Sequence, residues 1–144
     1  MVDTAQRGFV RHGARTWRDY FTFNTDHKVI GIQYMVMAFV FFIIGGLLAM
    51  VIRAELAAPG QQFVGGKAYN QLFTIHGTLM IFFWIIPAFV GLANYVVPLQ
   101  LGQEDMAFPR LNALSFWLVV PGAILMLTAF AVGGAESGWT AYPP

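Results

Sequence analysis

The sequence predicts an all-α fold, an integral membrane helical bundle with three transmembrane helices. Apolar residues make up 58% of the 144 residues and charged residues only 10%, whereas about 25% are charged in an average soluble domain. Three apolar runs, at about residues 29–52, 71–99 and 111–132, are each long enough to cross a hydrocarbon core of roughly 30 Å. The net charge of +1 gives no basic field that favours nucleic acid as a partner, and we expect membrane lipid instead.

Residues 1–28 are predicted to form a cytoplasmic arm ahead of the first span. The arm has neither the apolar core nor the cleavage site of a secretory signal peptide, and residues 1–15 can equally form a disordered tail. From about residue 16 onward, aromatic residues favour a position on the membrane face. The basic residues of the arm are Arg7, Arg11, Arg15, Arg18 and Lys28. Under the positive-inside rule they place the N-terminus in the cytoplasm.

The three spans differ in how they bend and end. The first ends at Arg53, before a Pro-Gly turn. The second contains Pro87, which removes a backbone donor and is expected to bend the helix, and the third contains Pro121. With the N-terminus inside, the connection at residues 100–110 lies in the cytoplasm. The first span carries small residues that suit close helix contacts: Gly31, Ala38, Gly45, Gly46 and Ala49.

His76 lies near the start of the second run and is the one histidine inside the apolar runs. A neutral imidazole in hydrocarbon needs a partner, and either a metal or a hydrogen bond to a neighbouring helix suits it. The chain has no cysteine, which excludes thiolate ligands and iron–sulfur clusters within it, and we favour a haem iron. His12 and His27 lie outside the runs, so a second histidine ligand would come from elsewhere.

Asp105 and Glu104 lie between the second and third runs. A carboxylate pair at such a connection is commonly only solvated. The alternative is a group that collects protons at the mouth of a water file lined by Asn94, Asn112 and Ser115. Asn112 and Ser115 have the spacing of residues that share a helix face. The residues alone leave both interpretations open.

Two charged residues follow the first run, and each has two interpretations. Arg53 is either an interfacial anchor or a permanently charged donor to the edge of a haem. Glu55 is either an exposed acid or part of a site for a hard cation such as Na⁺ or Ca²⁺, together with the turn that follows it.

Six motifs in the same order resemble subunit I of the haem-copper oxidases. They are residues 25–28 (TDHK), 53–60 (RAELAAPG), 74–77 (TIHG), 94–98 (NYVVP), 105–112 (DMAFPRLN) and 138–144 (GWTAYPP). The resemblance covers roughly residues 22–144. Each motif alone is weak, but six in order are specific.

The resemblance implies a role for each candidate residue. His76 would be one of two axial ligands of a low-spin haem, and Arg53 would hydrogen-bond a substituent of that haem, a formyl group in the favoured haem A. Trp139 and Tyr142 would lie near the haem propionates or the outer face of the active site. Asp105 would be the entrance of a D-type proton channel. The first part of that channel would be lined by Asn94, Asn112 and Ser115. A loop cation site would involve Glu55, Ala58, Gly60 and Gln62.

The resemblance further implies a respiratory terminal oxidase, a proton-translocating oxidoreductase of the cell inner membrane. Electrons would pass from cytochrome c through the low-spin haem to a haem-copper site that reduces O₂ to water. Subunit I of this family has about twelve spans, and the other haem ligands and the copper ligands belong to later helices. We therefore expect residues 29–144 to be its N-terminal three-helix part, which needs the remaining helices and subunits II and III.

The electron donor depends on a few positions. Ile44, Leu48 and Ala68 stand where quinol-oxidising relatives carry Arg, Asp and His, whereas Gln71 matches those relatives. We expect cytochrome c as the donor, with a quinol oxidase of the same family as the alternative. An alternative of another class is a non-catalytic membrane protein, such as an assembly or channel component.

Overall fold

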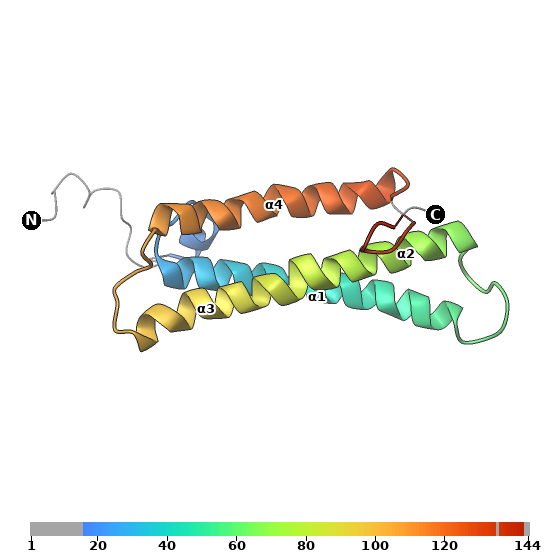
Figure 1. The fold of residues 1–144 in the computed structure, drawn as a ribbon, viewed down its shortest axis with the longest axis horizontal. Helices are drawn as coiled ribbons and strands as arrows, with labels where there is room; N and C mark the ends of the chain where they lie inside the picture. The colour runs from blue at the N-terminus through green and yellow to red at the C-terminus, as the bar shows by residue number, and fades with distance from the viewer. Residues whose placement is uncertain (1–15, 135, 143–144) are drawn as a thin grey trace, which may run out of the picture. The chain divides into compact units, whose positions relative to one another are not determined.

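The computed structural model describes residues 16–134 and 136–142. Within these ranges every regular element is a helix, which confirms the predicted all-α fold. The elements are η1 (Trp17–Phe21), α1 (His27–Glu55), α2 (Gly66–Thr78), η2 (Leu79–Ile85), α3 (Ile86–Gln100) and α4 (Pro109–Ala131) (Figure 1). Most of the predicted arm, including its basic residues Arg7, Arg11 and Arg15, lies outside the described residues.

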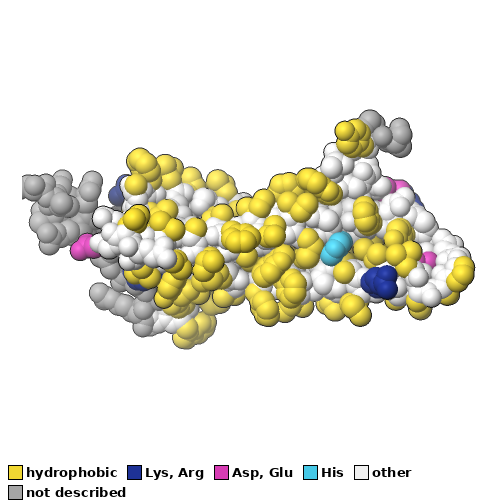
Figure 2. All heavy atoms as spheres, turned by 60° about the horizontal axis from the view of Figure 1, so that its bottom comes forward, with side chains coloured by type: hydrophobic (Ala, Val, Ile, Leu, Met, Phe, Trp, Pro, Cys, Tyr) yellow, Lys and Arg dark blue, Asp and Glu magenta, His cyan; other side chains and the backbone are white. Residues whose placement is uncertain are grey.

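Three helices of the described chain are long and apolar enough to cross a membrane: His27–Glu55, Gly66–Gln100 and Pro109–Ala131. They confirm the three predicted spans. The second helix begins at Gly66 rather than residue 71, because hydropathy locates only the part that suits hydrocarbon, and this helix continues into polar residues such as Lys67. Hydrophobic side chains lie along most of the face shown in Figure 2, as lipid or further apolar helices require.

The middle span is continuous but changes its hydrogen bonding. Its central part, η2, is a π-helix, and the N–H of Ile86 donates to the carbonyl oxygen of Ile81, five residues earlier. Pro87 follows at once, and it has no N–H for the α-helical bond to the carbonyl four residues before it. The distortion predicted at Pro87 therefore takes the form of a widened turn just ahead of the proline.

The chain divides into two compact units. Unit 1 combines the chain up to Val36 with Pro87–Pro121, and unit 2 combines Met37–Ile86 with the chain from Gly122. The buried apolar residues of unit 1 are Val29, Ile30, Tyr34, Ala113 and Phe116. The core of unit 2 is built on Phe41, Ile75, Leu79 and Ala123. Each unit therefore has its own small core.

In unit 1, α1 and α3 approach each other at backbone distance. A Cβ placed on Gly31 would lie 2.8 Å from the carbonyl oxygen of Gly91, and a Cβ on Gly91 would lie 2.8 Å from the oxygen of Gly31. Neither position has room for a side chain. Gly46, another small residue of α1, has nothing within 4 Å of the equivalent position, so it makes no such contact.

Gly91→Ala is expected to destabilise the protein by about 1–3 kcal/mol, because backbone atoms must move to admit the methyl group. The matched control is Gly46→Ala, which adds a methyl group in open space and should be neutral or stabilising by up to about 1 kcal/mol through helix propensity. Thermal unfolding in detergent, followed by circular dichroism, measures both. Equal midpoints for the two variants would contradict the close crossing.

Candidate functional site

His76 lies in α2, and its ring is held by α1. Nδ1 is 2.9 Å from the carbonyl oxygen of Gly45. A carbonyl oxygen only accepts, so Nδ1 carries the hydrogen and the lone pair of Nε2 is left for another partner. The side chain is half-buried, so a group beside α2 can reach it. Metal-ligating histidines characteristically donate their other N–H to a carbonyl in this way.

Gly45, whose carbonyl oxygen accepts this hydrogen bond, packs beside the end of Met80. A Cβ at Gly45 would collide with Cε of Met80 on η2. Ile75 and Leu79, on either side of His76 in the chain, belong to the apolar core of unit 2. The imidazole is therefore bonded beside tightly packed apolar side chains, where a hydrogen bond is stronger than in water.

The residues predicted to contact a haem lie in the same unit. Arg53 is exposed in the last turn of α1, roughly 12 Å along the helix axis from Gly45. The ring of Trp139 lies 6.5 Å from the ring of Phe82, centroid to centroid. Tyr142 is exposed. The structure thus places Arg53 on one helix and Trp139 against another, and it joins neither to His76 directly.

The segment that carries Trp139 contacts the last turns of α2. The N–H of Gly138 donates to Oγ1 of Thr74 at 2.9 Å. A Cβ on Gly77 would lie 3.5 Å from Cβ of Trp139. Nearer the start of α2, Nζ of Lys67 lies 3.5 Å from the carboxylate of Glu136. The segment that follows α4 therefore contacts α2 both inside the apolar run, at Thr74 and Gly77, and ahead of it, at Lys67.

Glu55 ends α1 and closes the loop that follows it. Its Oε1 accepts the N–H of Gln62 at 2.9 Å, and its Oε2 accepts those of Phe63 at 2.6 Å and Val64 at 3.1 Å. Glu55 lies beyond the charge-free run of α1. These hydrogen bonds lower the pKa of its carboxyl group, and the bond from the N–H of Gln62 has the largest effect. The carboxylate is therefore stabilised by backbone donors, as an anion in a nest of N–H groups is.

The same loop holds the residues predicted for a cation site: Glu55, Ala58, Gly60 and Gln62. The amide of Gln62 donates to the carbonyl oxygen of Pro59 at 3.0 Å. No cluster of three or more His, Asp or Glu side chains occurs in residues 16–134 and 136–142. A cation here would depend largely on carbonyl oxygens, and the site stays a prediction.

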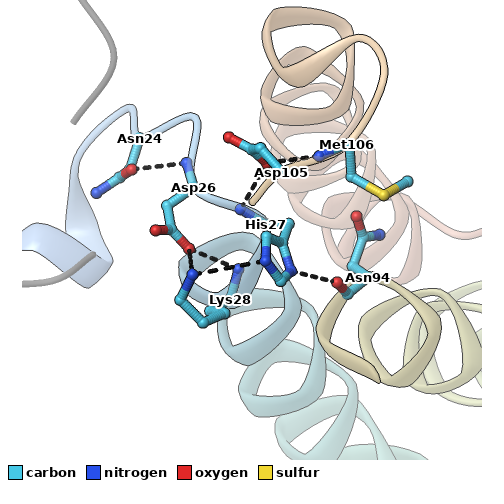
Figure 3. A network of polar contacts seen from close by, with 7 residues as sticks. All are labelled: Asn24, Asp26, His27, Lys28, Asn94, Asp105 and Met106. Carbon is cyan, nitrogen blue, oxygen red and sulfur yellow. Dashed lines mark hydrogen bonds and ion pairs between the residues drawn. The ribbon is translucent and has the colours of Figure 1, made fainter. Parts of the chain in front are cut away.

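In unit 1, His27 is fully buried at the start of α1, although the sequence placed it outside the spans. Nδ1 of His27 lies 2.8 Å from the carbonyl oxygen of Asn94 on α3, and its backbone N–H donates to Oδ1 of Asp105 at 3.3 Å. Nζ of Lys28 lies 3.5 Å from Nε2. His27 therefore joins α1 to α3 and to the connection that carries Asp105 (Figure 3).

The residues just before His27 form a helix start that the sequence analysis treated as part of the arm. Oδ1 of Asp26 accepts the N–H of Lys28 at 2.8 Å and pairs with its Nζ at 3.2 Å. Oδ1 of Asn24 accepts the N–H of Asp26 at 2.9 Å. An Asp before an apolar run is a typical N-cap, and this signal could have placed His27 inside the helix.

The predicted channel residues come together in unit 1, with one addition. Oγ of Ser115 donates to the carbonyl oxygen of Asn112 at 2.6 Å and lies 2.9 Å from the hydroxyl of Tyr34. A serine hydroxyl has a single hydrogen, so Tyr34 must be the donor to Ser115. Tyr34 was missed by sequence reasoning. A hydroxyl inside an apolar run is the signal that could have identified it.

Buried polar atoms that lack a hydrogen-bond partner also gather in unit 1. In the described part of the chain they are Asn24 Nδ2, Thr25 Oγ1, Gln33 Oε1, Asn94 Oδ1, Asn112 Nδ2 and Trp117 Nε1. Leaving such an atom unbonded costs about 1–3 kcal/mol, so these positions suit ordered water. Two of the atoms belong to the predicted channel residues Asn94 and Asn112.

The fold and these sites define a multi-pass helical membrane protein. Residues 29–144 match the family described as Cytochrome C and Quinol oxidase polypeptide I, and the chain belongs to that family. This agrees with the resemblance carried by the six motifs.

Relatives support the assignment. The chain is 56% identical over its whole length to Cytochrome c oxidase subunit 1 of Synechocystis sp., covering 26% of that protein. It is 58% identical over 89% of its length to the protein of the same name from Thermostichus vulcanus, covering 23% of it. The protein of that name from Corynebacterium glutamicum is 50% identical over 95% of this chain, which covers 24% of it. The chain thus spans about a quarter of the length of these relatives.

Glu55→Gln is expected to loosen the loop at residues 56–65, because the amide has one acceptor oxygen in place of the two carboxylate oxygens that accept the three N–H bonds. Hydrogen bonds to a charged group contribute more to stability than neutral ones, so their loss should accelerate amide exchange at residues 62–64 by roughly tenfold or more. Hydrogen exchange followed by mass spectrometry measures this. Glu104→Gln, at an exposed acid of another loop, is the control and should leave residues 62–64 unchanged. Equal exchange in both variants would contradict the clamp.

The same protection should depend on pH. The pKa of Glu55 is lowered in the folded loop. The ionised carboxylate therefore stabilises the loop fully when the pH is above the ordinary pKa of a Glu side chain. This stabilisation is lost as the pH falls through the lowered pKa of the folded loop. Amide exchange at residues 62–64, corrected for the intrinsic exchange rate at each pH, should therefore become faster as the pH falls through this range. Glu55→Gln should abolish the dependence.

Proposed function

We propose that this chain supplies an axial histidine to a low-spin haem of a cytochrome c oxidase, together with the entrance of its proton path. The observation that carries the first part is the bond between Nδ1 of His76 and the carbonyl oxygen of Gly45. It fixes one tautomer and leaves Nε2 as the only ring nitrogen that can bind iron.

The residues around His76 fit a haem. The carbonyl of Gly45 raises the basicity of the imidazole and prevents rotation of its ring. Arg53 would hydrogen-bond a substituent of the haem, and Trp139 and Tyr142 would lie near its propionates. When bound, a low-spin haem supplies one-electron transfer. The other axial ligand and the oxygen-reducing haem-copper site would come from parts of subunit I that this sequence does not contain.

Unit 1 is proposed to take up protons. In the described structure, Oδ1 of Asp105 accepts two hydrogen bonds, one from the backbone N–H of His27 and one from that of Met106. The carboxylate is thereby oriented, and Oδ2 is the oxygen at which a proton can be exchanged. From there, waters bonded by Asn94, Asn112 and Ser115 would carry protons inward, as in a D-type channel. With the N-terminus in the cytoplasm, this mouth opens inward.

For the whole protein we propose cytochrome c as the electron donor and subunits II and III as partners in a bacterial cytoplasmic membrane. The named relatives are cytochrome c oxidases. Ile44, Leu48 and Ala68 lack the side chains expected of a quinol site, which supports the same choice. A haem A would suit the guanidinium of Arg53, which can donate to a formyl group.

His76→Gly is expected to abolish the low-spin haem band in the reduced-minus-oxidised spectrum of the purified complex, because no other side chain offers that ligand. Added imidazole should restore the band, since it can occupy the space of the lost ring, and this separates loss of ligation from loss of folding. The control is Tyr34→Phe in unit 1, which should keep the band. A full band in His76→Gly without imidazole would refute the assignment.

Asp105→Asn is expected to slow turnover and proton uptake by roughly tenfold or more, since a side-chain amide is neither an acid nor a base near neutral pH and cannot relay protons. Haem content should stay unchanged. Glu104→Gln, at the neighbouring residue, serves as the control and should leave turnover intact. Stopped-flow proton uptake in liposomes measures the effect, and normal uptake by Asp105→Asn would exclude Asp105 as the entrance.

A further inference from the structure

The short helix η1 displays large apolar side chains on a fixed turn. Trp17 is 69% exposed and Phe21 is 73% exposed, with their rings 6.2 Å apart in an edge arrangement. The guanidinium of Arg18 lies 5.5 Å from the centre of the Trp17 ring. The turn is closed by Thr16, whose N–H donates to Oδ2 of Asp19 at 2.9 Å. The exposed rings are therefore held in place by the turn.

Gln33 ties this turn to the first span. The side chain of Gln33 is buried, and its amide donates to the carbonyl oxygens of Tyr20 at 2.9 Å and Thr22 at 3.4 Å. Gln33 lies roughly 9 Å along the axis from the start of α1. These bonds place η1 beside the first turns of α1, and in a membrane crossed by α1 it would lie near the level where hydrocarbon meets head groups.

We propose that η1 is a membrane-interface anchor, and that it binds the phospholipids of the leaflet in which α1 begins. Trp17 and Phe21 have the amphipathic and apolar character that the interface favours. Arg18 supplies a cation for lipid phosphate. The carboxylate of Asp19 is half-buried and hydrogen-bonded within the turn, whereas Arg18 is exposed, so the turn offers apolar rings beside one exposed cation, which fits anionic lipid. The anchor is independent of the function proposed above.

The anchor has a consequence for the mouth of unit 1. The chain between η1 and α1 includes Asn24 and Asp26, whose hydrogen bonds build the start of α1. His27 and its bond to Asp105 follow directly. Lipid bound at η1 would therefore hold the residues that orient Asp105.

Photo-crosslinking in the assembled complex tests the proposal. Benzoylphenylalanine is placed at position 17 or 21, the complex is reconstituted in nanodiscs of phosphatidylcholine and phosphatidylglycerol, and adducts are identified by mass spectrometry. Phospholipid adducts are expected at both positions. The control position is Tyr20, half-buried in the same turn, where lipid adducts should be several-fold fewer. Adducts to another protein chain, or no lipid adducts at either position, would overturn the proposal.

Two substitutions complete the test without the photo-reactive group. Trp17→Phe should remove part of the fluorescence that lipids brominated near the head group quench, and unchanged quenching would count against the anchor. Arg18→Gln should lower the share of phosphatidylglycerol among the adducts by up to about fivefold. An unchanged share would exclude the proposed attraction of anionic lipid by Arg18.

Discussion

The hydrogen bond from His76 to the carbonyl oxygen of Gly45 sets the chemistry of unit 2. A polar group in hydrocarbon must find its partner inside the protein, and the imidazole finds it on the neighbouring helix. A side chain at position 45 would displace the end of Met80. The bond depends on the core around Ile75 and Leu79, which holds α2 against α1. Helix packing thus determines which ring nitrogen is available.

Unit 1 meets this requirement only in part. His27 is bonded to Asn94 and to Asp105, but several other buried polar atoms have no partner within the described chain. Such unpartnered atoms are favourable only with water or further protein beside them. One unit therefore has a single imidazole bonded among apolar side chains, which suits an electron carrier. The other has a series of polar groups, which suits proton movement.

Hydropathy and the motifs predicted the spans and identified His76, since one histidine in an apolar run stands out in any sequence. They could not show that Nδ1 of His76 is bonded to Gly45, because that depends on how two helices pack. His27 was missed for the same reason: its partners Asn94 and Asp105 lie 67 and 78 residues away. The distortion at Pro87 was predictable, but its form as a π-helix depends on which carbonyl accepts each N–H.

Two of the prolines in the later spans, Pro87 and Pro121, lie at the borders of the units. Pro87 opens the second segment of unit 1, and Pro121 closes it. Each lacks an N–H, so the hydrogen-bond ladders of these two spans are interrupted where the chain passes from one unit to the other. The helix α1 contains no proline, and it passes from unit 1 to unit 2 between Val36 and Met37 with its backbone hydrogen bonds uninterrupted. Of the three spans, α1 is therefore the one whose backbone hydrogen bonds run without a gap where the chain passes from one unit to the other.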